Sequence, residues 1–152
     1  MEYEQIHSKH DLCQLLNIQT RKLTGLLYYT KIETCYRQFT IPKKNGGVRT
    51  INAPVGFLKF VQRKLSRLLL KRLDEISKQN NIKQEIAHAF FKGRSIKTNA
   101  LPHRNKKYLV NVDLKDFFDT IHFGRVQGFF KKNNYFKLPD EIATIIAQLT
   151  CY

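Results

Sequence analysis

Residues 36–78 read YRQFTIPKKNGGVRTINAPVGFLKFVQRKLSRLLLKRLDEISK, and this stretch decides the fold of the chain. Two strand-like runs flank the dipeptide Asn45-Gly46, which favours the positive backbone angles of a tight turn. Residues 35–53 are therefore predicted to form a β-hairpin, and Pro54 ends its second strand. Three cations surround the predicted tip: Lys43, Lys44 and Arg49.

Residues 55–78 are predicted to form a long amphipathic helix. Its apolar residues recur at helical spacing along one face: Leu58, Val61, Leu65, Leu68, Leu69, Leu73 and Ile76. Its opposite face carries basic residues four positions apart: Lys59, Arg63, Arg67 and Lys71. Because like charges at this spacing repel one another, the row favours contact with nucleic-acid phosphates; the alternative is a solvated basic face.

Shorter elements complete a predicted α+β pattern. Two helices are expected within residues 9–28, capped by Asp11 and Thr20, and Ser95 is expected to cap another. Leucines are expected to turn inward from the first pair: Leu12, Leu15, Leu16, Leu23, Leu26 and Leu27. Residues 108–113 alternate like a buried strand. Two further helices are expected over 122–133 and 138–150.

Charge is distributed unevenly along the 152 residues. The formal net charge is +15, and no acidic residue interrupts the ten cations between Glu33 and Asp74 or the six between Glu85 and Asp113. Such a balance indicates an anionic partner, nucleic acid first and an acidic membrane surface second. Three cysteines without metal-ligand spacing indicate reduced thiols in a cytoplasmic protein, and no run is long enough for a membrane span. The polar, acidic N-terminus predicts no signal or transit peptide.

A carboxylate at the end of a predicted strand, Asp113, is the candidate metal ligand. Mg²⁺ takes oxygen ligands and usually only one or two carboxylates. A two-metal polymerase site needs at least one more aspartate from another segment. Asp116 and Asp119 are poor candidates for that partner, because they follow where the chain turns into the next helix. An ordinary helix cap is the alternative for Asp113.

Three ordered segments of the chain resemble one family. VNVDLKDFFDTIHFGRV (residues 110–126) is similar to the first aspartate motif of bacterial reverse transcriptases in their retron form. FTIPKKNGGVRTINAPVGFLKFVQRKL (39–65) resembles the fingers hairpin and following helix of that family, and AHAFFKGRSIKTNALPH (87–103) its second fingers segment. Reverse transcriptases of group II introns are similar, but the sequences GRSIKTNALPH (93–103) and FFDTIHFGRV (117–126) are closer to those of retron enzymes.

The resemblance implies part of a right-hand polymerase. Residues 1–33 would be an N-terminal helical segment, 34–107 the fingers, and 108–152 the start of the palm with its first strand. The Tyr-Ala-Asp-Asp turn of the family, which carries the remaining metal carboxylates, is not in this sequence. We therefore expect an N-terminal portion that is inactive alone and encodes only part of a two-metal Mg²⁺ site.

The resemblance also implies roles for single residues. Asp113 would bind the catalytic metal with help from the backbone carbonyl of Leu114. The backbone amides of Asp116 and Phe117 would cradle the incoming deoxynucleoside triphosphate, and Phe118 would exclude a ribose 2′-hydroxyl. Lys43 and Arg49 would close on the triphosphate, with Lys44 able to replace Lys43. Two residues of the second fingers segment would run near the template: Lys92 and Arg94.

The function implied by the resemblance is RNA-directed DNA synthesis. The expected partners are a structured non-coding RNA that serves as template and primer, deoxynucleoside triphosphates, the RNA–DNA hybrid and an effector protein, in antiphage defence. One rival is a group II intron-like or other defence-associated reverse transcriptase. The other is a basic RNA-binding module that keeps the fold without the chemistry.

Overall fold

The computed structural model describes residues 2–43, 46–81, 87–89, 91, 93–115 and 117–151. Within it the chain forms two compact units. The first combines Met1–Leu73 with Ile121–Tyr152, and the second is Asp74–Thr120. The boundary falls inside the longest helix, α3 (Gly56–Gln79), which confirms the helix predicted over residues 55–78.

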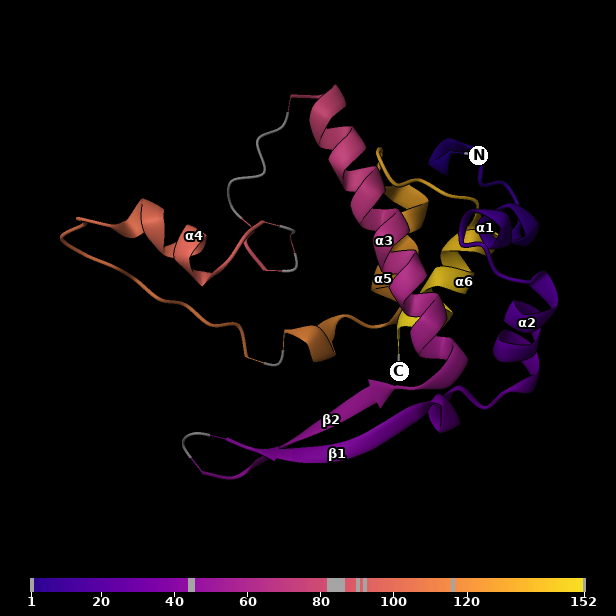
Figure 1. The fold of residues 1–152 in the computed structure, drawn as a ribbon, viewed down its shortest axis with the longest axis horizontal. Helices are drawn as coiled ribbons and strands as arrows, with labels where there is room; N and C mark the ends of the chain where they lie inside the picture. Colours follow the sequence, from indigo (N-terminus) through magenta and orange to yellow (C-terminus); the bar gives the residue numbers. More distant parts are fainter. Residues whose placement is uncertain are drawn as a thin grey trace. The chain divides into compact units, whose positions relative to one another are not determined.

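The first unit is a set of helices around one apolar core (Figure 1). Besides α3, its helices are α1 (Lys9–Leu15), α2 (Thr20–Thr24), α5 (Phe123–Lys132) and α6 (Asp140–Thr150). Four of the six inward leucines are fully buried and the other two pack against the core, as predicted. The predicted apolar face of α3 is also confirmed, because Leu58, Val61 and Leu65 are buried.

The innermost helix of this unit is α6. Six of its eleven residues are buried: Ile142, Ala143, Ile145, Ile146, Ala147 and Leu149. It packs against α5 and α1, and Asp140 and Glu141 in its first turn complement the positive end of the helix dipole. A helix with apolar residues on so much of its circumference is stable only when its neighbours cover it, so α6 organises the unit.

The start of α1 corrects one expected cap. Ser8, not Asp11, is the N-cap, and its hydroxyl accepts a hydrogen bond from the Asp11 amide at 3.3 Å. The Asp11 carboxylate reciprocates by accepting from the Ser8 amide at 2.8 Å and from the Ser8 hydroxyl at 2.9 Å. These bonds, the hydroxyl first, hold the pKa of Asp11 below its usual value. Thr20 is likewise the first residue of α2, after the N-cap Gln19.

The predicted hairpin is present as β1 (Tyr36–Pro42) and β2 (Val48–Pro54), paired antiparallel with Phe39 opposite Ile51. The Gly46 amide donates to the Lys43 carbonyl at 3.2 Å, and the Lys43 amide donates to the Gly47 carbonyl at 3.0 Å. Gly46 and Gly47 adopt φ of 83° and 80°, a region that glycine enters without strain. Lys44 and Asn45 lie outside the described residues. Figure 1 shows the strands reaching away from the helices of this unit.

Polar side chains of α3, Gln62 and Arg72 among them, tie this helix to its surroundings. The Gln62 amide group donates to the Leu149 carbonyl of α6 at 2.7 Å and to the Tyr36 hydroxyl at 3.2 Å. Near the other end, Arg72 donates to the Tyr135 carbonyl through Nε at 3.2 Å and Nη2 at 3.1 Å, and it also pairs with Glu4. Its guanidinium lies 5.1 Å from the ring centre of Tyr3. Burial raises the pKa of the Tyr3 hydroxyl.

The second unit has less regular structure. Ser95 caps α4 (Ile96–Ala100) as predicted, and a 3₁₀ turn at Leu101–His103 contains Pro102. The strand expected over residues 108–113 is not formed: this stretch is irregular, with Val110 82 % exposed instead of buried. A strand persists only when a neighbour pairs with its backbone, and the two strands that the structure describes pair with each other.

Helices and a two-stranded sheet together fit the predicted α+β class. Among the residues that the structure describes, no helix combines the length and the apolar character that a membrane span requires.

We predict that Arg72→Ala lowers the free energy of unfolding by about 2 kcal/mol, because several hydrogen bonds to a well-covered guanidinium are lost at once. Arg67→Ala is the matched control: Arg67 is exposed on the same helix, and its removal should change stability by less than about 0.5 kcal/mol. Denaturant unfolding of the two variants measures the difference. Equal stabilities would contradict the structural role of Arg72.

Candidate functional site

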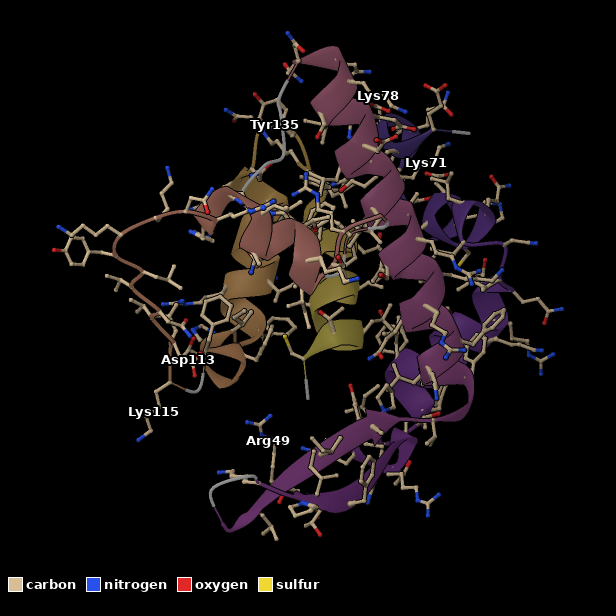
Figure 2. All side chains as sticks on the ribbon, turned by 60° about the vertical axis from the view of Figure 1, so that its left-hand side comes forward. Arg49, Lys71, Lys78, Asp113, Lys115 and Tyr135 are labelled. Atoms are coloured by element: carbon tan, nitrogen blue, oxygen red, sulfur yellow. The ribbon has the colours of Figure 1, made fainter. Side chains whose placement is uncertain are left out.

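The hairpin presents Arg49 on one exposed face. Opposite residues of an antiparallel pair share a face, so Arg49 lies with Ile41, and the Phe39–Ile51 pair is next along the same face. Figure 2 shows the Arg49 side chain projecting from the hairpin near its tip. Phe39 is 45 % exposed and Ile41 39 % exposed, so the guanidinium stands beside an uncovered apolar strip.

The two middle residue pairs on the other face of the hairpin are polar. Gln38 donates to the Asn52 side-chain oxygen at 3.1 Å, and Thr40 stands opposite Thr50. The alternation of side chains along the two predicted strands is the sequence signal that places Arg49 on one face with apolar residues. Lys43 follows β1 directly and is exposed. The structure thus brings Lys43 and Arg49 to one end of the hairpin.

The basic row of α3 lies in solvent, on the side away from the buried leucines. All four of its members are exposed: Lys59, Arg63, Arg67 and Lys71. Each step of four residues advances about 6 Å along a helix, so the row extends about 18 Å. Within the described residues, no hydrogen bond or ion pair engages the side chains of Lys59, Arg63 and Arg67.

Other cations of α3 have structural roles. Lys64 donates to the Asn17 carbonyl at 3.1 Å and lies 4.8 Å from the ring centre of Phe60. Lys78 pairs with Asp74 at 2.7 Å, one turn away, and Arg72 is held as described above. The basic row predicted from the sequence therefore does not include the cations of α3 that make these structural contacts. Figure 2 labels Lys71 and Lys78 near the end of the helix.

The segment that precedes α4 holds Arg94 within a small loop. The Arg94 side chain donates to the Ala87 carbonyl and lies 5.3 Å from the ring centre of Phe91. A contact of 2.9 Å between His88 Nδ1 and the Thr98 hydroxyl also links the loop to α4. Arg94 is half-buried, so in this structure it shapes the loop. Lys92 lies outside the described residues.

Asp113 lies in the irregular segment of the second unit and is exposed (Figure 2). The next carbonyl, that of Leu114, accepts a hydrogen bond from the Phe117 amide at 3.3 Å. The Leu114 carbonyl, predicted to bind the metal, is thus hydrogen-bonded to the Phe117 amide, predicted to bind the triphosphate. This bond leaves the second lone pair of the carbonyl for a cation. Asp116 lies outside the described residues.

Phe117 and Phe118 complete this segment. Their rings meet edge to face with centres 5.4 Å apart, and Phe118 is 71 % exposed. The Phe117 carbonyl accepts from the Thr120 hydroxyl at 2.7 Å, which fixes the short 3₁₀ turn Phe118–Thr120. Phe118 is therefore presented to solvent from an ordered turn that follows Asp113.

The Asp113 carboxylate and the Leu114 carbonyl are suited to form part of a magnesium site. A carboxylate and a backbone carbonyl are oxygen ligands of the kind that Mg²⁺ prefers. No group of three histidine, cysteine or acidic side chains capable of holding a metal occurs among the residues described. Asp113 and Leu114 could therefore supply two oxygen ligands of such an ion.

Comparison with known proteins identifies the class. Residues 41–150 match the family model described as reverse transcriptase (RNA-dependent DNA polymerase). This match covers most of the chain: it begins near the end of β1 and includes β2, α3, the Asp113 segment and α6. The chain belongs to the reverse transcriptase family.

The curated relatives are of the retron type, as the sequence resemblance indicated. Retron Mx162 reverse transcriptase of Myxococcus xanthus is 33 % identical over 148 residues, which are 96 % of this chain and 28 % of that protein. Retron Mx65 reverse transcriptase of the same organism is 44 % identical over 93 residues, 61 % of this chain and 20 % of that protein. Retron Ec86 reverse transcriptase of Escherichia coli is 29 % identical over 97 % of this chain and 42 % of its own length. The chain thus spans less than half the length of these relatives.

Proposed function

We propose that the complete protein containing this chain is an RNA-directed DNA polymerase of the retron type. The observation that carries the proposal is the family match over residues 41–150, because it includes the hairpin tip with β2 as well as the Asp113 segment. The proposed domains are an N-terminal helical segment (1–33), fingers (34–107) and the beginning of a palm (108–152) in a right-hand polymerase.

Asp113 is proposed to hold a catalytic Mg²⁺ ion, with the Leu114 carbonyl as a second ligand. Bound divalent ions activate the attacking hydroxyl and neutralise charge that develops on the phosphate. The exposure of Asp113 supports this role, because an exposed carboxylate is accessible to a hydrated cation and to substrate phosphates. Asp113 would hold the ion through its carboxylate oxygens.

Two groups of residues are proposed to bind the incoming deoxynucleoside triphosphate. Lys43 and Arg49 would bind its phosphates from the hairpin, since a guanidinium offers paired donors to phosphate oxygens, and Lys44 could share this task. The Asp116 and Phe117 amides would cradle the triphosphate, which requires the Phe117 amide to leave the Leu114 carbonyl. The Phe118 ring would occupy the space that a ribose 2′-hydroxyl needs.

The nucleic acid is proposed to lie along the exposed row of α3: Lys59, Arg63, Arg67 and Lys71. Regular exposure and the lack of carboxylates on α3 before Asp74 support this contact. Lys92 and Arg94 are proposed to run near the template, and Arg94 would do so while holding its loop.

The proposed template and primer is a structured non-coding RNA, which yields an RNA–DNA hybrid, and the proposed setting is antiphage defence in the cytoplasm with an effector protein. The retron names of the relatives support the RNA partner. A non-catalytic RNA-binding module is the alternative, favoured by the lack of a three-residue metal cluster among the described residues. A group II intron-like enzyme is the rival of the same class.

We predict that Asp113→Asn in the complete enzyme abolishes DNA synthesis and leaves RNA affinity unchanged, because it removes a metal ligand and no phosphate contact. Primer extension on an RNA template with Mg²⁺ measures the first effect, and RNA titration measures the second. Asp74→Asn, which removes an exposed carboxylate paired with Lys78, is the control and should retain activity. DNA synthesis at the wild-type rate by Asp113→Asn would disprove the metal assignment.

We predict that Phe118→Ala raises the incorporation of ribonucleotides relative to deoxynucleotides by at least about tenfold, because a loss of roughly 1.4 kcal/mol of discrimination corresponds to that factor. Phe117→Ala is the control, since it removes the ring in contact with Phe118 but keeps the backbone amide. Single-nucleotide incorporation with paired substrates gives the ratio. An equal change in both variants would mean that only ring packing matters.

We predict that reversing Arg63 and Arg67 to Glu weakens the binding of unrelated RNAs to a similar degree, because phosphate contacts do not read sequence. The slope of log affinity against log salt should flatten by about 1.4 to 1.8, at roughly 0.7–0.9 per phosphate. The control carries the same charge change on α5, with Arg125 and Lys132 reversed, and should keep the wild-type slope. If both double variants lose the same slope, the α3 row is not a specific contact.

A further inference from the structure

Two adjacent tyrosines stand in solvent at the end of a π-helical turn, Gly25–Tyr29, that follows α2. Tyr28 is 59 % exposed and Tyr29 86 % exposed. Leu26 of the same turn is buried in the core, and the Thr30 hydroxyl donates to the Gly25 carbonyl at 3.0 Å. The turn is therefore anchored from inside while it presents two aromatic rings outward, and π-helical turns are frequent at functional sites.

The surroundings of these rings are basic. The Lys9 ammonium lies 5.3 Å from the ring centre of Tyr28, and exposed Lys31 follows Tyr29 by two residues. Arg21 and Lys22, on α2 just before the turn, are also exposed. Residues 9–33 contain two carboxylates against these four cations, and one of the two, Asp11, is engaged in the cap of α1.

This combination fits unpaired nucleic acid. Exposed aromatic rings stack on bases that are free of a duplex, and nearby ammonium groups bind the linking phosphates. Most protein interfaces instead have a core depleted of charge, whereas here the Lys9 ammonium lies against the Tyr28 ring. Paired bases already stack on each other, so the same rings offer little to a continuous duplex.

We propose that Tyr28 and Tyr29, together with Lys9 and Lys31, form a binding site for a single-stranded stretch of RNA. The inference deepens the proposed function and rests on it for the identity of the nucleic acid. The site differs in kind from the basic row of α3: that row carries charge on a helix face, whereas this surface combines stacking with charge and so distinguishes unpaired from paired RNA. It would hold a loop or an unpaired end of a structured RNA.

The test measures how tightly the protein binds two labelled RNAs, an unstructured 12-nucleotide strand and a 12-base-pair duplex. Tyr29→Ala should weaken binding of the strand about tenfold, and Tyr28→Ala combined with Tyr29→Ala should weaken it further, since each stacked base contributes roughly that factor. Duplex binding should change less than twofold, and Tyr29→Phe should bind the strand like the wild type. Replacing Lys9 and Lys31 by Ala should lower the salt slope for the strand by about 1.4.

Tyr135→Ala is the matched control, because Tyr135 is another exposed tyrosine of the first unit, at 45 %, outside this surface. It should leave both affinities unchanged, and circular dichroism of all variants checks the fold. Unchanged binding of the strand by the double tyrosine variant overturns the inference and would leave a protein as the occupant of this surface. Equal losses for strand and duplex overturn it as well.

Primer extension by the wild type separates this inference from the proposed function. If the wild type synthesises DNA but the tyrosine variants bind the strand as it does, the inference fails and the proposed function stands. If the wild type synthesises no DNA but tyrosine-dependent binding of the strand is found, the RNA site stands and the polymerase assignment fails.

Discussion

The burial of one face of α3 determines what the first unit shows to solvent. Leu58, Val61 and Leu65 pack into the core, and Gln62 bonds to α6 and to Tyr36 at the base of the hairpin. Because this face is buried, helical geometry places the residues of the opposite face in solvent. The same burial anchors the chain where β2 ends, so the hairpin projects from a fixed base. The basic row and the hairpin thus depend on one packing event.

Arginines of this chain have different roles in the structure: some stabilise the fold and others are exposed to solvent. Arg72 bonds to a carbonyl, a carboxylate and a ring, and Arg94 closes a loop, whereas Arg63 and Arg67 stand in solvent. A count of charges does not distinguish them, although the guanidinium groups of Arg72 and Arg94 are occupied by contacts within the protein. The net charge of +15 therefore overstates the positive surface available to a partner.

Local patterns in the sequence predicted most of the first unit, because a helix or a hairpin satisfies its own backbone. The Asp11 cap was misplaced by three residues, since Ser8 and Asp11 are both good capping residues and only geometry separates them. The strand before Asp113 could not be settled, because its pairing is not local. For the site, the resemblance predicted Asp113, Lys43 and Arg49 as residues, but not the Phe117–Leu114 bond. Tyr28 and Tyr29 were missed because they end an apolar helical run and looked like part of it.

The irregular run around Val110 has a consequence for the behaviour of the chain in the cell. Tyr108, Leu109, Val110 and Val112 are exposed and strand-prone, the composition of segments that associate with copies of themselves. Lys106, Lys107 and Lys115 flank this run. Charges in such places act as gatekeepers, because stacking identical segments would bring the ammonium groups of neighbouring chains together. The lysines thus protect a segment that has no strand partner among the described residues, and neutralising them would remove this barrier to association between copies of the chain.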